Sequence, residues 1–310
     1  MPLIVEALVP VLVLIAIGYG LRRAGFPGDG FWRPAARTVY FVFLPALLLR
    51  IIALAQLDPQ VWRAQVVAVL TVCAVTILLL LTRKRVSSSG PKFTSVVQGS
   101  VRHNTYIGLA IAGAVFTSDE VAVFALIVAV VVPLVNAISV AVLGRYGSRS
   151  GEDGRLNSAQ TLKLVAVNPL IVACAIGAVL NVSGVGLPSF VGDVFQMLAR
   201  PALPLGLLVV GAGLQLRALV NISREMVIPL LLRLVLYPAL ALGLALWLGL
   251  PNYHLAPLML LASLPTAASA FVLAVELGGD EDLMACIITM ETIAAAVTIP
   301  TVLWVALQLR

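Results

Sequence analysis

The chain contains the same pattern of five apolar segments twice, one after the other. Matching residues occur in the same order at offsets between 156 and 161. Because five is an odd number, a second copy in a membrane enters it from the opposite side, which predicts an inverted-topology repeat around one central site. The matches are Pro10 with Pro169, Ile17-Gly18 with Ile176-Gly177, Leu21 with Leu180, Pro45-Ala46-Leu47 with Pro201-Ala202-Leu203, Asn104-Thr105 with Pro265-Thr266, and Asp119-Glu120 with Asp280-Glu281.

The composition indicates that the apolar segments lie in a lipid bilayer. Of the 310 residues, 61% are hydrophobic and 11% are charged, which is too little charge to cover a soluble domain. Each segment has at least 17 residues and is long enough to cross a hydrocarbon core of about 30 Å. We therefore expect an all-α membrane protein with ten transmembrane helices in one membrane domain. The expected helices cover residues 3–22, 36–55, 64–82, 93–117, 119–144, 159–181, 194–216, 225–249, 254–277 and 282–308.

A polar segment at residues 145–158, rich in Gly, Ser and Arg, is the longest connection between the expected helices. It is typical of a flexible linker. We therefore expect residues 1–150 to form the first five-helix repeat and residues 151–310 to form the second, inverted one. The first apolar segment is not expected to be a cleaved signal peptide, because no basic residue precedes it.

The net charge of +6 sets the orientation of the chain. Fourteen Lys and Arg residues fall in alternate connections and only four on the opposite side, so the positive-inside rule places both termini on the non-cytoplasmic side. This distribution predicts a multi-pass protein of the cell (cytoplasmic) membrane and argues against a nucleic-acid partner. Three cysteines inside apolar segments and two isolated histidines predict neither a disulfide framework nor a metal site, and no other cofactor is expected.

Two of the apolar segments, the fourth and the ninth, are interrupted by polar, Gly or Pro residues at matching depths. The interruptions fall near residues 104–108 and 265–269. Unwound backbone in a membrane requires partners from protein or water, and paired interruptions in two repeats mark the substrate site of many carriers. A simple proline kink is the alternative interpretation, and the match between the two copies favours a site.

The interrupted helices predict a site for a small anion. The second half-helices would present free N–H groups near Gly108-Leu109 and Ser269-Ala270, each carrying roughly half a positive charge from the helix dipole. Arg102 and His103 would add positive charge. The candidate substrate-binding residues are Asn104, Thr105, Tyr106, Gly108, Pro265, Thr266 and Ser269.

Other polar residues lie deep inside apolar segments. Glu291 in the tenth segment is a candidate proton carrier or a structural hydrogen-bond partner, and the sequence leaves both roles open. Arg233 is expected to snorkel or to pair with a carboxylate. Asn136 and Asn168 are expected to bond between helices, with a site contact as the second interpretation for each. Glu291, Asn136, His103 and Arg102 are therefore candidates for ion coupling or for support of the site.

Motifs at the interruptions resemble those of the auxin efflux carrier family, which includes bacterial organic-acid carriers and the plant PIN auxin exporters. Asn104-Thr105 with Gly108 is similar to a family stretch of Asn-Thr followed by Gly and Pro. Residues 264–274, which begin Leu-Pro-Thr, are similar to the family segment Pro-Pro-Ala-x-Asn-Ala-Phe. Thr298-Ile-Pro300 and Phe43-Leu-Pro45 resemble further family motifs, and the resemblance extends over essentially the whole chain.

The resemblance implies ten helices in a five-plus-five inverted repeat, with helices four and nine broken and crossing at the substrate. It also implies a scaffold subdomain, through which a homodimer would form, and a transport subdomain that moves like an elevator. The chain departs from the family pattern at three positions. Ala110 stands where proline is usual, Ser269 where Asn is common, and Glu291 where a small hydroxyl residue is common.

The leading hypothesis is a secondary carrier of a small organic anion, such as a malonate-like, malate-like or auxin-like carboxylate, with H⁺ or Na⁺ as candidate coupling ions. A sodium- or proton-coupled bile-acid-type symporter or antiporter of related fold is the first alternative. A non-transporting membrane sensor on a carrier fold is the second. An intramembrane enzyme is disfavoured, because HExxH and paired catalytic residues in facing segments are missing.

Overall fold

The computed structural model describes residues 2–28, 30–55, 60–148, 163, 166–216, 220 and 222–309. Every secondary-structure element in these ranges is a helix. Within the same ranges, six helical stretches are long and apolar enough to cross a membrane, so the described part of the chain is all-helical with candidate membrane spans. The predicted linker, residues 145–158, is described only as far as residue 148. The predicted repeat boundary after residue 150 lies outside the described residues.

The helices of the first half follow the predicted segments closely. They are α1 (Pro2–Arg23), α2 (Trp32–Thr38), η1 (Val39–Phe43), α3 (Leu44–Leu54), α4 (Trp62–Leu81), the short α5 (Arg83–Val86), α6 (Gly90–Val101), α7 (Thr105–Val115) and α8 (Ser118–Tyr146). The predicted helix 36–55 is continuous through α2, η1 and α3, whereas the predicted helix 93–117 is divided into α6 and α7.

The second half is also helical in its described residues. Its helices are α10 (Pro169–Val182), α11 (Ser189–Ala199), α12 (Ala202–Gly213), α13 (Arg224–Leu231), η3 (Leu232–Leu236), α14 (Tyr237–Trp247), α15 (Asn252–Ser263), α16 (Ser269–Leu277) and α17 (Glu281–Gln308). The predicted helix 254–277 is divided into α15 and α16. The five-plus-five arrangement across a bilayer stays a prediction.

The two π-helical turns, η1 and η3, each precede a proline. Pro45 follows η1, and Pro238 follows η3. A proline has no N–H and its ring crowds the carbonyl four residues earlier, so the helix locally widens to a π-turn. Tyr40 and Arg233 lie in these two turns and are both buried.

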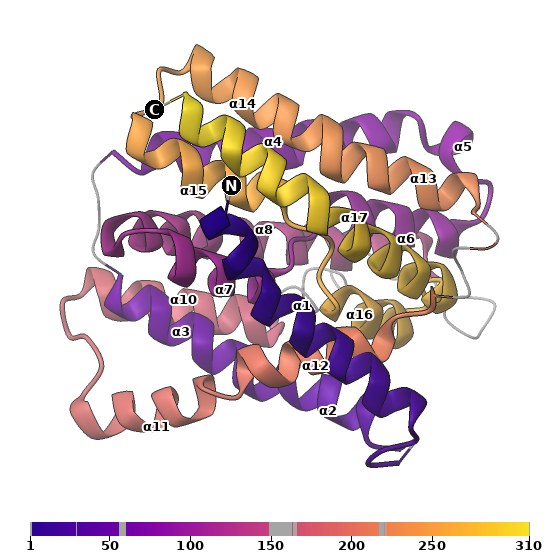
Figure 1. Cartoon of the computed structure of the whole chain (residues 1–310), viewed down its shortest axis with the longest axis horizontal. Coiled ribbons are helices and arrows are strands. Elements are labelled where there is room, and N and C mark those ends of the chain that lie inside the picture. Colours follow the sequence, from indigo (N-terminus) through magenta and orange to yellow (C-terminus); the bar gives the residue numbers. More distant parts are fainter. Residues whose placement is uncertain are drawn as a thin grey trace.

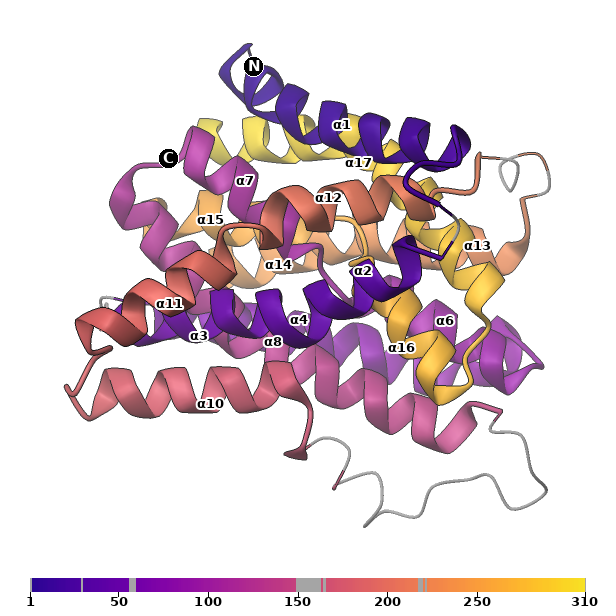
Figure 2. The same ribbon diagram turned by 90° about the horizontal axis from the view of Figure 1, so that it is seen from below.

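The helices form two groups that pack side by side (Figures 1 and 2). The flanking group consists of α1, α2, η1, α3, α10, α11 and α12. The crossing group consists of α4, α6, α7, α8 and α13 to α17, with α8 and α15 packed together near its centre. The interrupted helices of both halves belong to the crossing group.

Matched glycines of the two copies make equivalent contacts in the flanking group. Gly18 of α1 lies against the backbone of α12, where a Cβ would overlap the carbonyl oxygen of Leu208. Gly177 of α10 lies against α3, where a Cβ would be 2.8 Å from the carbonyl oxygen of Leu49. Small residues let membrane helices approach closely enough for backbone contact, so these glycines set the spacing within the flanking group.

Gly18→Ala is expected to lower the stability of the protein by roughly 1–3 kcal/mol, because the new methyl group must push α1 away from α12. Gly20→Ala on the same helix is the control, since a Cβ there meets nothing within 4 Å. Thermal unfolding of the detergent-purified variants, followed by tryptophan fluorescence, measures the difference. Equal melting temperatures for the two variants would contradict this account of the α1–α12 contact.

Candidate functional site

The first interruption separates α6 from α7. Residues 102–104 leave the helical conformation between Val101 and Thr105, and α7 restarts with Asn104 as its cap. The side-chain oxygen of Asn104 accepts a hydrogen bond from the N–H of Ile107 at 3.2 Å. Asn is a preferred capping residue because its side chain satisfies one of the free amides at a helix start. Thr105 and Tyr106 therefore carry the first amides of α7.

The second interruption covers residues 264–268, between the end of α15 at Ser263 and the start of α16 at Ser269. Pro265 explains why the helix is interrupted here. It has no N–H for a helical bond, and it disfavours the helical conformation of the residue before it, Leu264. Leu264 is accordingly extended.

The two interruptions bond directly to each other. The N–H of Asn104 donates to the carbonyl of Pro265 at 2.8 Å, and the hydroxyl of Thr266 donates to the carbonyl of Gly99 in α6 at 2.5 Å. Thr266 and Asn104 are fully buried. Each break therefore satisfies backbone groups that the other leaves free, as unwound backbone inside a membrane requires.

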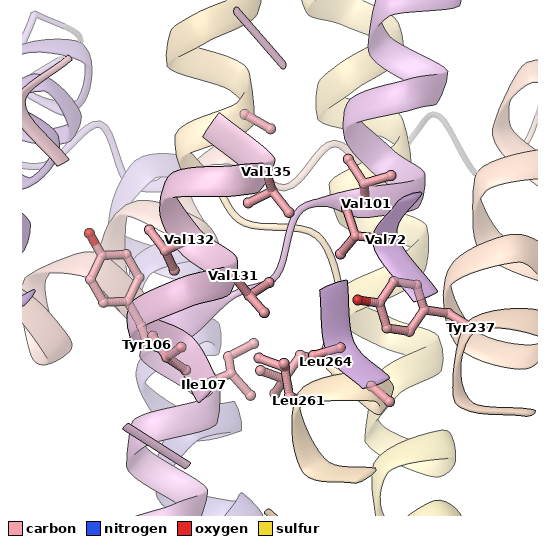
Figure 3. Close-up of a cluster of buried hydrophobic side chains, with 14 of the residues drawn as sticks. Val72, Val101, Tyr106, Ile107, Val131, Val132, Val135, Tyr237, Leu261 and Leu264 are labelled. Carbon is pink, nitrogen blue, oxygen red and sulfur yellow. The ribbon is translucent and has the colours of Figure 1, made fainter. Parts of the chain in front are cut away.

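The two joined interruptions are called the crossing below. Apolar side chains pack against it. Figure 3 shows Ile107, Val131, Leu261 and Leu264 gathered beside the two extended segments, with Tyr106 and Tyr237 on opposite sides of this cluster. The same packing leaves no room for a side chain at Gly108, where a Cβ would lie 2.7 Å from Leu264 and from Phe124. The crossing is a closely packed junction.

Glu291 of α17 attaches a third helix to the crossing. Its Oε2 atom accepts a hydrogen bond from the N–H of Thr266 at 2.9 Å, and its side chain is fully buried. It borders neither of the two cavities described below. In this conformation Glu291 bonds to the backbone of the second break. This contact fits the structural hydrogen-bonding role, one of the two roles predicted for Glu291.

Arg102 lies in the first break and connects it to two other helices. Its Nη1 atom donates to the side-chain oxygen of Asn136 in α8 at 2.8 Å, and its Nη2 atom donates to the hydroxyl of Ser269 at the start of α16 at 2.8 Å. The side chain is buried, and its Nε has no hydrogen-bond partner. A full positive charge therefore lies beside the positive end of the α16 dipole, a combination that favours an anion.

Arg102 borders the smaller of two cavities. This pocket of about 20 Å³, enough for about one water molecule, lies between α7, α8 and α16 of the crossing group and α3 and α10 of the flanking group. A larger cavity of about 460 Å³ lies between the flanking and crossing groups and reaches Ala268, the neighbour of Ser269. Arg22, Arg33 and Arg37 line it on the flanking side. Arg37 forms an ion pair with Glu276 of α16 at 3.4 Å across it.

The predicted site residues divide into two sets. Six line the small pocket: Arg102, His103, Thr105, Tyr106, Asn136 and Ser269. The other five, Asn104, Gly108, Pro265, Thr266 and Glu291, build the crossing behind it. The free amides predicted at Gly108-Leu109 and at Ser269-Ala270 need correction. The first break lies earlier than expected, and the N–H of Gly108 bonds to the carbonyl of Asn104 at 3.0 Å. At the second break, the N–H of Ala270 bonds to the carbonyl of Ala267 at 2.9 Å.

Two residues of the crossing were not among the predicted site residues. Arg233 does not snorkel, since its exposed fraction is 0%, and its Nη2 donates to the carbonyl of Leu261 at 2.9 Å. Tyr237 lies under the Arg233 guanidinium and bonds to the ring of His103 at 3.1 Å between the hydroxyl and Nε2. Both residues belong to an apolar segment far from the interruptions in sequence, so only the fold brings them there.

The polar residues near the crossing do not resemble a metal centre. Within the described ranges, no three His, Cys, Asp or Glu side chains are grouped closely enough to hold a metal ion. Asn168 also lies apart from the pocket and donates to the hydroxyl of Tyr40 at 3.0 Å.

Comparison with known proteins places the chain in a family. Residues 3–303 match the family described as "Membrane transport protein". The chain is also similar to an "Uncharacterized transporter" of Methanothermobacter thermautotrophicus, with 27% identity over 307 residues and 96% of each chain covered. The match extends over nearly the whole chain and is to transporters rather than to enzymes. The chain belongs to the membrane transport protein family, the auxin efflux carrier family that its motifs resemble.

Proposed function

We propose that this protein is a carrier for a small organic anion whose carboxylate binds beside Arg102. The main support is the position of that guanidinium, buried in a helix break and bonded to Ser269 at the amino end of α16. One guanidinium adds a full charge to the two helix ends, which contribute about half a charge each. A carboxylate is the organic group that best matches such a planar, two-pronged donor.

The substrate would exchange hydrogen bonds with side chains that now satisfy Arg102. Asn136 and Ser269 each accept one bond from it, and the pocket between them has room for about one water molecule. A carboxylate entering from the larger cavity would therefore replace one of these acceptors. The hydroxyl of Ser269 and the amides at the start of α7 would then donate to the second carboxylate oxygen.

The proposed mechanism is alternating access by movement of the crossing group past the flanking group. The larger cavity lies between the two groups, and residues from both line it. Its arginine-rich side is the side that the positive-inside rule assigns to the cytoplasm. The conformation described here would then open the site toward the cytoplasm, and the Arg37–Glu276 ion pair would have to separate when the groups slide.

Arg102→Gln tests the binding site. Loss of a charged hydrogen-bond donor should weaken carboxylate binding by about 10- to 100-fold, and Arg102→Lys should fall between this variant and the wild type. Uptake of radiolabelled mono- and dicarboxylates into proteoliposomes measures the effect, with Arg23→Gln at the surface as the control. Binding without uptake would identify a sensor, and unchanged uptake by Arg102→Gln would exclude this site.

Cross-linking of positions 37 and 276 tests the movement. Arg37→Cys and Glu276→Cys, introduced after replacement of Cys73, Cys174 and Cys286, should allow a short bifunctional thiol reagent to join the two groups and stop uptake until the link is cleaved. Ala55→Cys with Asn181→Cys is the control, because both positions belong to the flanking segments and lie in hydrogen-bond contact. Full uptake by the completely cross-linked 37–276 variant would contradict the sliding mechanism.

A further inference from the structure

Arg233 is a second buried cation in the crossing group, and the proposed binding site does not use it. Its side chain is wholly buried in η3 and lines neither cavity. The centre of its guanidinium lies 4.4 Å from the ring centroid of Tyr237, a cation–π contact. Figure 3 places Tyr237 on the side of the apolar cluster opposite Tyr106, which lines the small pocket. Arg102 lines the small pocket, whereas Arg233 borders neither cavity.

The guanidinium of Arg233 lies at the carboxyl end of an interrupted helix. Its Nη2 donates at 2.9 Å to the carbonyl of Leu261, which belongs to the last turn of α15. The final carbonyls of a helix have no partners within it and carry the negative end of its dipole. In carriers with broken helices, such ends coordinate the transported coupling cation. The electrostatics of α15 therefore favour a cation here.

A carboxylate faces the same place from α17. Glu291 uses Oε2 to hold the N–H of Thr266, while its Oε1 has no hydrogen-bond partner. This Oε1 atom lies beside α13: a Cβ on Gly99 would be 3.6 Å from it and 3.0 Å from Pro229, one helical turn before Arg233. Because α17 packs against both α13 and η3, the opposite charges of Glu291 and Arg233 attract each other across this contact. Arg233 in turn keeps Nε and Nη1 without hydrogen-bond partners. The carboxylate and the helix end together present negative charge, and the fixed guanidinium supplies the balancing positive charge.

We propose that Arg233 is a built-in cation that occupies, at the carboxyl end of α15 and opposite Glu291, the place of a coupling sodium ion. The protein then binds no sodium at the crossing. If the chain is the carrier proposed above, its uptake does not require a sodium gradient. Arg233 lines neither cavity, so the proposal can hold whatever the substrate is.

Melting of the purified protein in NaCl and in choline chloride at equal ionic strength tests the proposal without a substrate. The wild type and Arg233→Lys should melt at the same temperature in both salts. Arg233→Gln leaves Glu291 and the helix end without their cation, so it should melt lower by on the order of 5 °C. Sodium, but not choline, should recover part of that loss because the vacated place now accepts a small cation.

The double variant Arg233→Gln/Glu291→Gln decides whether the two charges act as a pair. It should regain most of the lost stability in choline and lose the response to sodium, since no buried charge then remains unpaired. Arg63→Gln is the matched control, because Arg63 donates to the carbonyl of Gly249 beyond α14 at 3.2 Å but at the surface. It should melt like the wild type in both salts.

Three results would overturn the proposal. A sodium-specific rise in the melting temperature of the wild type would show that the crossing already binds the ion. A double variant no more stable than Arg233→Gln would show that the two charges are not coupled. If Arg233→Gln does not fold, a double variant that also does not fold would likewise show that the two charges are not coupled. The organic-anion function is judged separately, by wild-type carboxylate uptake in sodium-free proteoliposomes.

Discussion

The hydrogen bonds between the two helix breaks are the interaction on which the rest of the structure depends. Asn104 donates to Pro265, and Thr266 donates to Gly99, so backbone groups that two separate interruptions would leave bare are satisfied within the protein. In an apolar environment each unsatisfied group would cost several kcal/mol. Neither break is stable alone, and the crossing therefore has to form as a unit.

Once the breaks are joined, their positions determine what surrounds them. The first break places Arg102 where it can reach Asn136 and Ser269, and the start of α16 points its dipole toward the same pocket. The carboxyl end of α15 bonds to Arg233 instead. One junction thus has an anion-favouring side and a cation-favouring side, and a buried arginine serves each of them.

Much of the fold follows from patterns that the sequence carries openly. Apolar length predicts the helices, and Pro265 with the polar run before Gly108 predicts where two of them stop, because proline and unsatisfied polar groups act locally. The first break lies earlier in the chain than predicted. Asn104 caps α7, so the helix resumes at Thr105 and the exposed amides lie before Gly108.

The division of the site into pocket and junction could not be predicted, since it depends on contacts between residues far apart in the chain. Thr266 meets Glu291 and Gly99, and Arg233 meets Leu261, through packing that no local pattern encodes. The departures from the family motifs become intelligible in the same way. Ser269 accepts a bond from Arg102, and Glu291 holds the second break while facing Arg233.

The central claim is that the crossing holds an organic anion beside Arg102. An experimental structure of the protein with a bromine-labelled carboxylate, located by the anomalous signal of bromine, tests it most directly. The account predicts the carboxylate between Arg102 and the amino ends of α7 and α16, with the bromine directed toward the larger cavity. A label bound elsewhere, with the Arg102–Ser269 bond intact, would contradict it.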